Sequence, residues 1–123
     1  MSKFILVVDD EEDVRAIAKL GLEMAANWQV LIASSGKEAV DLAQTHQPDL
    51  ILLDLMMPDW DGRTTLAKLK TNPATKAIPV ILMTAKTQQS TQEELAELDV
   101  VAVFTKPFRP LQLPAQIKEV LGK

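Results

Sequence analysis

The sequence contains no cysteine, no long uninterrupted hydrophobic run and no excess of basic residues. Without cysteine, disulfides, thiol catalysis and zinc–thiolate sites are all excluded. No apolar run approaches the roughly 20 residues that a membrane-spanning helix needs, and the first residues lack the pattern of a signal peptide. The net charge of −4 argues against sequence-independent binding to nucleic acid. We therefore expect a cytoplasmic protein without membrane insertion or direct contact with nucleic acid.

The remaining composition is that of an ordinary globular domain. Hydrophobic residues make up 47% of the chain and charged residues 24%, which is typical of globular proteins. A chain of 123 residues has the length of one domain with one substantial core. We find no linker, internal repeat or low-complexity segment, so we expect a single domain over residues 1–123.

Short strand-like runs alternate with segments of helical periodicity along the whole chain. The strand-like runs, rich in Val, Ile and Leu, lie at residues 4–8, 28–33, 50–53, 80–83 and 100–105. Helices are predicted at residues 11–26, after residue 35, around residues 66–69, at 87–98 and from about residue 114. This alternation predicts βαβ units and therefore an α/β fold, in which a doubly wound, five-stranded parallel sheet carries five helices.

Three of the predicted helices have a marked start or face. In the first, the spacing of Val14, Ile17, Gly21 and Met24 places these residues on one apolar face. The second opens on Ser35, which forms a capping box with the glutamate three residues later. The last is expected to start close to Pro114, because proline is poorly tolerated in a helix interior.

Polar residues close four of the five strand-like runs. Asp9 and Asp10 follow the first run, Asp54 the third, Thr84 the fourth and Lys106 the fifth. Ligands of open α/β sheets bind outside the carboxyl ends of the strands, so we expect these side chains to converge. Crowded carboxylates favour a hard divalent cation such as Mg²⁺, while a lysine and a hydroxyl suit phosphoryl oxygens. The pattern predicts a phosphoryl-transfer site with a carboxylate nucleophile.

Four stretches around these strand ends resemble the response-regulator receiver domain of two-component signalling, and in particular the chemotaxis-regulator type. They lie at residues 5–11, 48–62, 78–85 and 106–108, and the similarity covers essentially the whole chain. The resemblance implies a flavodoxin-like fold with strand order 2-1-3-4-5. It also implies a stand-alone receiver domain without an output domain.

The resemblance assigns a role to each strand-end residue. Asp54 would accept a phosphoryl group from a sensor histidine kinase or a phosphotransfer protein. Thr84 would donate a hydrogen bond to that group, and Lys106 would pair with it. The Mg²⁺ ligands would be Asp9, Asp10, Asp54 and the backbone carbonyl of Met56. In the family, the positions that Met56 and Lys86 occupy influence how fast water removes the phosphoryl group, and a bulky Met56 is expected to slow its loss.

Family members signal through the face formed by the helix at 87–98, the strand at 100–105 and the last helix. Their switch uses an aromatic residue three positions before the lysine, where this chain has Val103. Phe104 follows it, and strand alternation should send Phe104 to the opposite face of the sheet. The output is expected to be an unknown downstream protein, bound by a monomer or by a phosphorylation-promoted dimer. Candidate docking residues are Lys86, Gln89, Glu93, Glu97, Phe104 and Arg109.

Two other classes of function remain as alternatives. One is an adaptor that has the receiver fold but works without phosphorylation, and the presence of all five strand-end residues argues against it. The other is an aspartate-nucleophile phosphatase of the haloacid dehalogenase type. Those enzymes place a D-x-D pair after the first strand, whereas Asp9 and Asp10 are adjacent and Asp54 closes the third run. We therefore expect a signalling protein that catalyses only its own phosphorylation and dephosphorylation.

Overall fold

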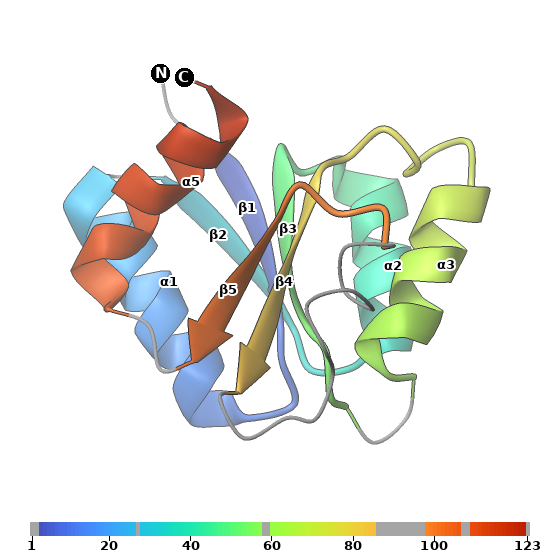
Figure 1. The fold of residues 1–123 in the computed structure, drawn as a ribbon, viewed down its shortest axis with the longest axis horizontal. Coiled ribbons are helices and arrows are strands. Elements are labelled where there is room, and N and C mark those ends of the chain that lie inside the picture. The colour runs from blue at the N-terminus through green and yellow to red at the C-terminus, as the bar shows by residue number, and fades with distance from the viewer. Residues whose placement is uncertain (1–2, 27, 58–59, 86–97, 107–108, 123) are drawn as a thin grey trace.

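The sheet of this protein is parallel throughout. The computed structural model describes residues 3–26, 28–57, 60–85, 98–106 and 109–122. The strands are β1 (Phe4–Val8), β2 (Gln29–Ala33), β3 (Leu50–Asp54), β4 (Val80–Ala85) and β5 (Ala102–Lys106). They are ordered β2-β1-β3-β4-β5, and each neighbouring pair is parallel (Figure 1). The predicted doubly wound sheet and its strand order are thereby confirmed.

In the part of the chain that the structure describes, four of the five strands are followed by helices. They are α1 (Glu12–Ala26), α2 (Gly36–His46), α3 (Gly62–Thr71) and α5 (Leu113–Leu121), with the short 3-10 helix η1 (Pro110–Gln112) directly before α5. Proline lies in the first turn of α5, as predicted, and Ser35 Oγ accepts the backbone N–H of Glu38 at the start of α2. None of the helices in the described part of the chain is long and apolar enough to cross a membrane.

Part of the predicted signalling face falls outside the described residues. This applies to residues 87–97 of the expected helix and to the docking candidates Lys86, Gln89, Glu93 and Glu97. The expectations for these residues therefore stay predictions.

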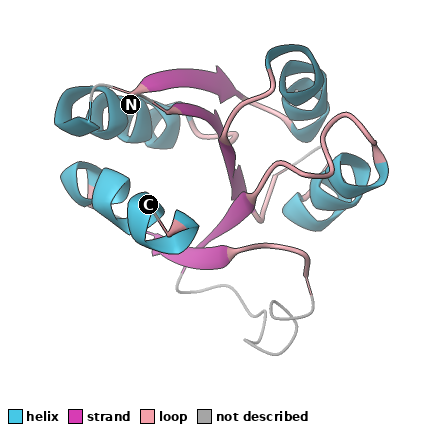
Figure 2. Ribbon diagram, turned by 90° about the horizontal axis from the view of Figure 1, so that it is seen from above, coloured by secondary structure: helices cyan, strands magenta, loops and turns pink. Residues whose placement is uncertain are grey.

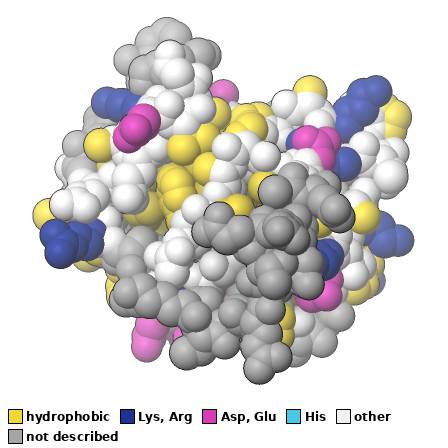
Figure 3. Space-filling model, in the orientation of Figure 1, with side chains coloured by type: hydrophobic (Ala, Val, Ile, Leu, Met, Phe, Trp, Pro, Cys, Tyr) yellow, Lys and Arg dark blue, Asp and Glu magenta, His cyan; other side chains and the backbone are white. Residues whose placement is uncertain are grey.

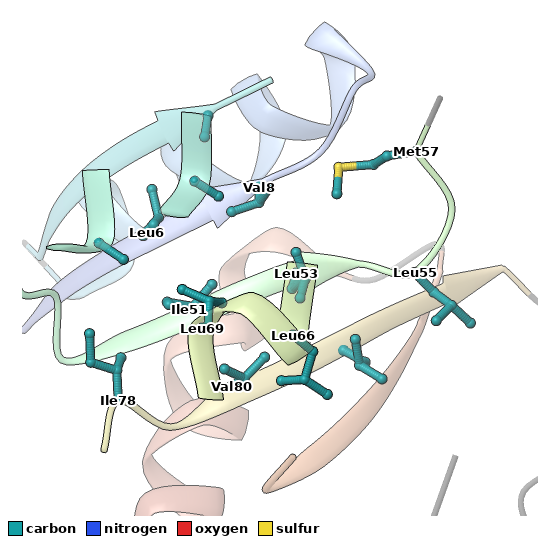
Figure 4. Close-up of a cluster of buried hydrophobic side chains, with 14 residues drawn as sticks. Leu6, Val8, Ile51, Leu53, Leu55, Met57, Leu66, Leu69, Ile78 and Val80 are labelled. Atoms are coloured by element: carbon teal, nitrogen blue, oxygen red, sulfur yellow. The ribbon is translucent and has the colours of Figure 1, made fainter. Parts of the chain in front are cut away.

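Among the described residues, α1 and α5 cover one face of the sheet, and α2 and α3 cover the other (Figure 2). Toward α1 and α5 the inner strands direct Ile5, Val7, Leu50, Leu52, Ile81 and Met83. Toward α2 and α3 they direct Leu6, Val8, Ile51, Leu53, Val80 and Leu82 (Figure 4). Because alternate residues pack on opposite faces and both faces are buried, the strands appear in the sequence as continuous hydrophobic runs.

The apolar face predicted for α1 is partly wrong. Ala18 and Leu22 are fully buried, whereas Ile17 is 44% exposed and Met24 is 70% exposed. Gly21 is buried because the segment before α5 crosses it closely, and a Cβ at this position would collide with the backbone of Pro110. A contact between segments far apart in the chain therefore decides which side of α1 faces inward.

Strand β5 directs Val103 and Phe104 to opposite faces, as predicted. Phe104 pairs in register with Met83 and packs against the cluster beneath α1 and α5. Val103 pairs with Leu82, so it shares a sheet face with Thr84 two residues further along β4. Apolar side chains gather on the surface between α5 and β5 (Figure 3). Phe104 therefore lies on the face of the sheet opposite to the one that Val103 and Thr84 share.

Candidate functional site

Charged side chains meet at the carboxyl ends of three strands. Lys106 Nζ, at the end of β5, lies 2.6 Å from Asp9 Oδ2 and 3.1 Å from Asp54 Oδ1. Asp9, Asp10 and Asp54 can each offer one carboxylate oxygen, and these atoms lie within 4.8 Å of one another. The predicted convergence of these four side chains is confirmed, because β1 pairs with β3 and all strands point the same way.

Asp9 is held on every side by hydrogen bonds. Its side chain is fully buried, with Oδ1 accepting the backbone N–H of Glu11 at 2.9 Å and Oδ2 accepting Lys106 Nζ. Its own N–H donates to the carbonyl of Ala33 at 3.1 Å. Its carbonyl accepts a hydrogen bond from Arg15 Nη1 at 2.7 Å. A carboxylate with these donors is fixed in one orientation, whereas Asp10 beside it is exposed to solvent.

Asp54 is buried in an environment that disfavours its charge. Only 2% of the residue is exposed, and this burial, together with repulsion from Asp9, raises the pKa of Asp54 to about 6. Lys106 and the backbone N–H of Met56 oppose the shift, the latter donating to Oδ1 at 3.3 Å. Among the described residues, Lys106 is the one ammonium paired with the carboxylates of Asp9 and Asp54, and Asp10 lies close by, so Asp54 would gain from a further cation.

Lys106 remains a cation despite its partial burial. Burial alone would lower its pKa, but the hydrogen bond that Lys106 donates to Asp9 and the charges of Asp54 and Asp9 outweigh this effect, so the pKa of Lys106 is raised. The side chain is 15% exposed. Lys106 therefore carries a permanent positive charge between two carboxylates.

The start of α3 lies against the end of β3. Gly62 donates its N–H to the carbonyl of Leu55 at 2.7 Å, and a Cβ on Gly62 would lie only 2.7 Å from the carbonyl oxygen of Asp54. Asp61 caps α3 by accepting the N–H of Thr64 at 2.8 Å. The side chain of Met56 is 58% exposed.

Thr84 lies one residue beyond the β4 partner of Asp54. Met83 pairs in register with Asp54, and Thr84 follows it with 8% of its surface exposed. Within the part of the chain that the structure describes, its hydroxyl has no hydrogen-bond partner. The structure thus places Thr84 on the strand beside β3 but shows no hydrogen bond between Thr84 and the four charged side chains.

Arg15 is the residue of this site that the sequence analysis missed. An arginine in the first turns of an amphipathic helix has no sequence signal that separates it from a solvated surface charge. Only the fold shows that α1 turns back along β1, so that the guanidinium reaches the carbonyl at the strand end.

The donor atoms at this site suit a magnesium ion. The candidate ligands of Asp9, Asp10 and Asp54 are all carboxylate oxygens, and Asp10 is open to solvent. Mg²⁺ prefers a small number of carboxylates and completes its shell with water or phosphate oxygens. The raised pKa of Asp54 points the same way, because burial and the charge of Asp9 disfavour the ionised carboxylate, which a bound cation would stabilise.

Comparison with known sequences gives a consistent family. A family model described as the response regulator receiver domain matches residues 5–118. The alkaline phosphatase synthesis transcriptional regulatory protein PhoP of Bacillus subtilis is 37% identical over 123 residues, which are 100% of this chain and 50% of that protein. The phosphate regulon transcriptional regulatory protein PhoB of Pseudomonas aeruginosa is also 37% identical, over 100% of this chain and 53% of that protein. The chain spans about half the length of these curated relatives.

Solved structures agree with the sequence relatives. The chemotaxis protein CheY4 of Vibrio cholerae superposes with a TM-score of 0.86 at 26% identity, over 98% of this chain and 99% of that one. A response regulator from Desulfuromonas acetoxidans gives a TM-score of 0.85 at 28% identity, over 98% and 97% of the two chains.

Proposed function

Because the chain belongs to the response regulator receiver domain family, we propose that Asp54 accepts a phosphoryl group from a phosphohistidine of a sensor histidine kinase or phosphotransfer protein. A carboxylate oxygen of Asp54 attacks the phosphorus, the phosphorus–nitrogen bond breaks, and an acyl phosphate forms. The observation that supports this role is the buried carboxylate of Asp54 at the end of β3, next to Lys106 and two further carboxylates.

The neighbouring residues serve this reaction in different ways. Asp9, Asp10, Asp54 and the backbone carbonyl of Met56 would hold Mg²⁺, which supplies positive charge to the transferring phosphoryl group. Lys106 would pair with a phosphoryl oxygen, since its ammonium already lies within 3.1 Å of the Asp54 carboxylate. Thr84 would donate its hydroxyl, which has no protein partner among the described residues, to another phosphoryl oxygen.

The new charge would be transmitted to a protein partner. The relatives PhoP and PhoB are transcriptional regulatory proteins, and half of their length lies outside the similarity with this chain. For this chain we propose a cytoplasmic signalling role in which phosphorylation changes the binding of a downstream protein, or promotes dimerisation, through β5, α5 and the segment before β5. Among the described residues, Phe104 and Arg109 are the docking candidates on that face. The protein would catalyse only its own phosphorylation and dephosphorylation.

Intact-mass measurement after incubation with Mg²⁺ and acetyl phosphate tests the proposal. The wild-type protein should gain one phosphoryl group, and so should Asp41→Asn, which changes an exposed carboxylate of α2. Asp54→Asn should gain none. If the wild-type protein binds Mg²⁺ but gains no phosphoryl group, the adaptor function is supported instead. If Asp54→Asn is phosphorylated as fully as the wild type, another residue is the acceptor.

A further inference from the structure

Asp9 and Asp10 are joined by a peptide group that has a single side-chain partner among the described residues. The carbonyl of that group belongs to Asp9 and its N–H to Asp10, and the two lie in one rigid plane. Arg15 Nη1 donates to the carbonyl at 2.7 Å from the second turn of α1. The position of the guanidinium therefore fixes the orientation of the plane, and with it the direction in which the Asp10 side chain leaves the backbone.

Asp10 depends on this orientation more than the other two carboxylates do. The carboxylate of Asp9 accepts hydrogen bonds from Glu11 and Lys106, and that of Asp54 accepts from Met56 and Lys106. Asp10 is exposed, and its carboxylate has no hydrogen bond or ion pair with any residue in the described ranges. Its oxygen nevertheless lies within 4.8 Å of those of its two neighbours. As far as the described residues show, only the backbone holds it there.

The two cations of this region act on different atoms. Lys106 Nζ contacts carboxylate oxygens, which are atoms that a metal ion would also use. The guanidinium of Arg15 instead contacts a backbone carbonyl, so it leaves every carboxylate oxygen available. Arg15 can therefore support the arrangement of the acidic side chains without competing for their ligand atoms.

We propose that Arg15 is a positioning residue for a divalent cation, because its guanidinium holds the Asp9–Asp10 peptide so that the Asp10 carboxylate is directed toward those of Asp9 and Asp54. This inference rests on the proposed Mg²⁺ site. Residues that orient metal ligands typically change metal affinity by about 10- to 100-fold when they are removed.

Charge and positioning predict opposite results when Arg15 is replaced. Arg15→Met removes a cation from the end of β1, where the guanidinium contacts the Asp9 carbonyl, and by electrostatics alone this should tighten the binding of Mg²⁺. The loss of the contact that positions the Asp9–Asp10 peptide should instead weaken the binding of Mg²⁺. Titration calorimetry with Mg²⁺ alone should show about tenfold weaker binding for Arg15→Met. Arg15→Lys, which keeps the charge and can donate one hydrogen bond, should restore part of the affinity.

Lys19→Met provides the matched control. Lys19 lies one helical turn further along α1, and its ammonium pairs with Glu23 at 3.1 Å rather than with the site. This change also removes one positive charge and a long side chain from the helix. The Mg²⁺ affinity of Lys19→Met should stay within about twofold of the wild type, because no metal ligand depends on that side chain.

A double-mutant cycle tests whether Arg15 acts through Asp10. In an Asp10→Asn background, Arg15→Met should change Mg²⁺ affinity by less than about twofold, because the ligand that it positions is already lost. If Arg15→Met weakened Mg²⁺ binding through a general loss of stability, the weakening would persist in the Asp10→Asn background. Without metal, the carbonyl ¹³C resonance of Asp9 should move in Arg15→Met and stay in place in Lys19→Met.

The outcomes separate this inference from the proposed function. Wild-type protein that does not bind Mg²⁺ would overturn both. Wild-type protein that binds Mg²⁺, with Arg15→Met binding it equally or more tightly, would overturn the positioning role alone. If Arg15→Met changed the Mg²⁺ affinity equally in the wild-type and Asp10→Asn backgrounds, the positioning role alone would also be overturned. Weaker binding that depends on Asp10, together with partial rescue by Arg15→Lys, is the result expected.

Discussion

Replacing the proposed phosphoacceptor by asparagine should make the protein more stable at neutral pH. Burial and the charge of Asp9 raise the pKa of Asp54 from 3.8 to about 6. Between these two values the folded protein binds more protons than the unfolded chain, so stability falls as the pH rises through this window. Above about pH 6 the folded state carries the full cost of keeping Asp54 ionised. Asparagine has nearly the same shape and cannot ionise.

The size of the effect follows from the pKa. The rise from 3.8 to about 6, at about 1.36 kcal/mol per pKa unit, corresponds to roughly 3 kcal/mol at pH 7.5. This pKa already includes the ion pair with Lys106, whose ammonium keeps its contact with Asp9 when Asp54 is replaced, so a net gain of about 1–3 kcal/mol is expected. With an unfolding entropy of about 2.1 cal/mol/K per residue, this gain raises Tm by roughly 4–12 °C.

Urea unfolding followed by circular dichroism, in EDTA and at several pH values, measures this gain directly. The advantage of Asp54→Asn over the wild type should be largest above pH 6, decrease as the pH falls toward 4, and shrink when Mg²⁺ is added at pH 7.5. Asp41→Asn, at an exposed position of α2, should change stability little at any pH. An Asp54→Asn variant that is no more stable than the wild type at pH 7.5, with a difference independent of pH, would refute the reasoning.

Three further predictions concern the same site. Lys106→Met leaves two buried carboxylates unpaired, so it should cost about 3 kcal/mol at pH 7.5 and less at pH 5, by urea unfolding. Gly62→Ala should cost about 1–3 kcal/mol or more in the same assay, because the new Cβ would lie 2.7 Å from the carbonyl oxygen of Asp54. Met56→Asn should shorten the lifetime of the phosphorylated protein, followed by intact mass over time; an unchanged or longer lifetime would contradict the proposed shielding by Met56.

The strands and the charged cluster could be predicted from the sequence for one physical reason. Strands covered by helices on both faces need apolar residues at every position, which leaves runs such as Leu50–Leu53 visible without any knowledge of the fold. In a parallel sheet the residues that end these runs lie along one edge. Asp9, Asp54 and Lys106 could therefore be brought together before any distance was known.

The features that the sequence could not show depend on contacts between distant segments. The inward side of α1 is set by the crossing of Pro110 over Gly21, so the spacing that placed Ile17 and Met24 on the buried face was only partly right. The contact of Arg15 with the end of β1 depends on how α1 turns back along the sheet. The raised pKa of Asp54 depends on the degree of burial and on the distance to its neighbours, which residue order does not encode.

The measurement that tests the central claim most directly is the location of the phosphoryl group among the three clustered carboxylates. Wild-type protein would be treated with acetyl phosphate and Mg²⁺, trapped by borohydride reduction of the acyl phosphate, digested and sequenced by mass spectrometry. Reduction converts a phosphorylated aspartate into homoserine. The account predicts homoserine at position 54, at a level that falls sharply in EDTA. Homoserine at position 9 or 10 instead, or at none of the three, would contradict it.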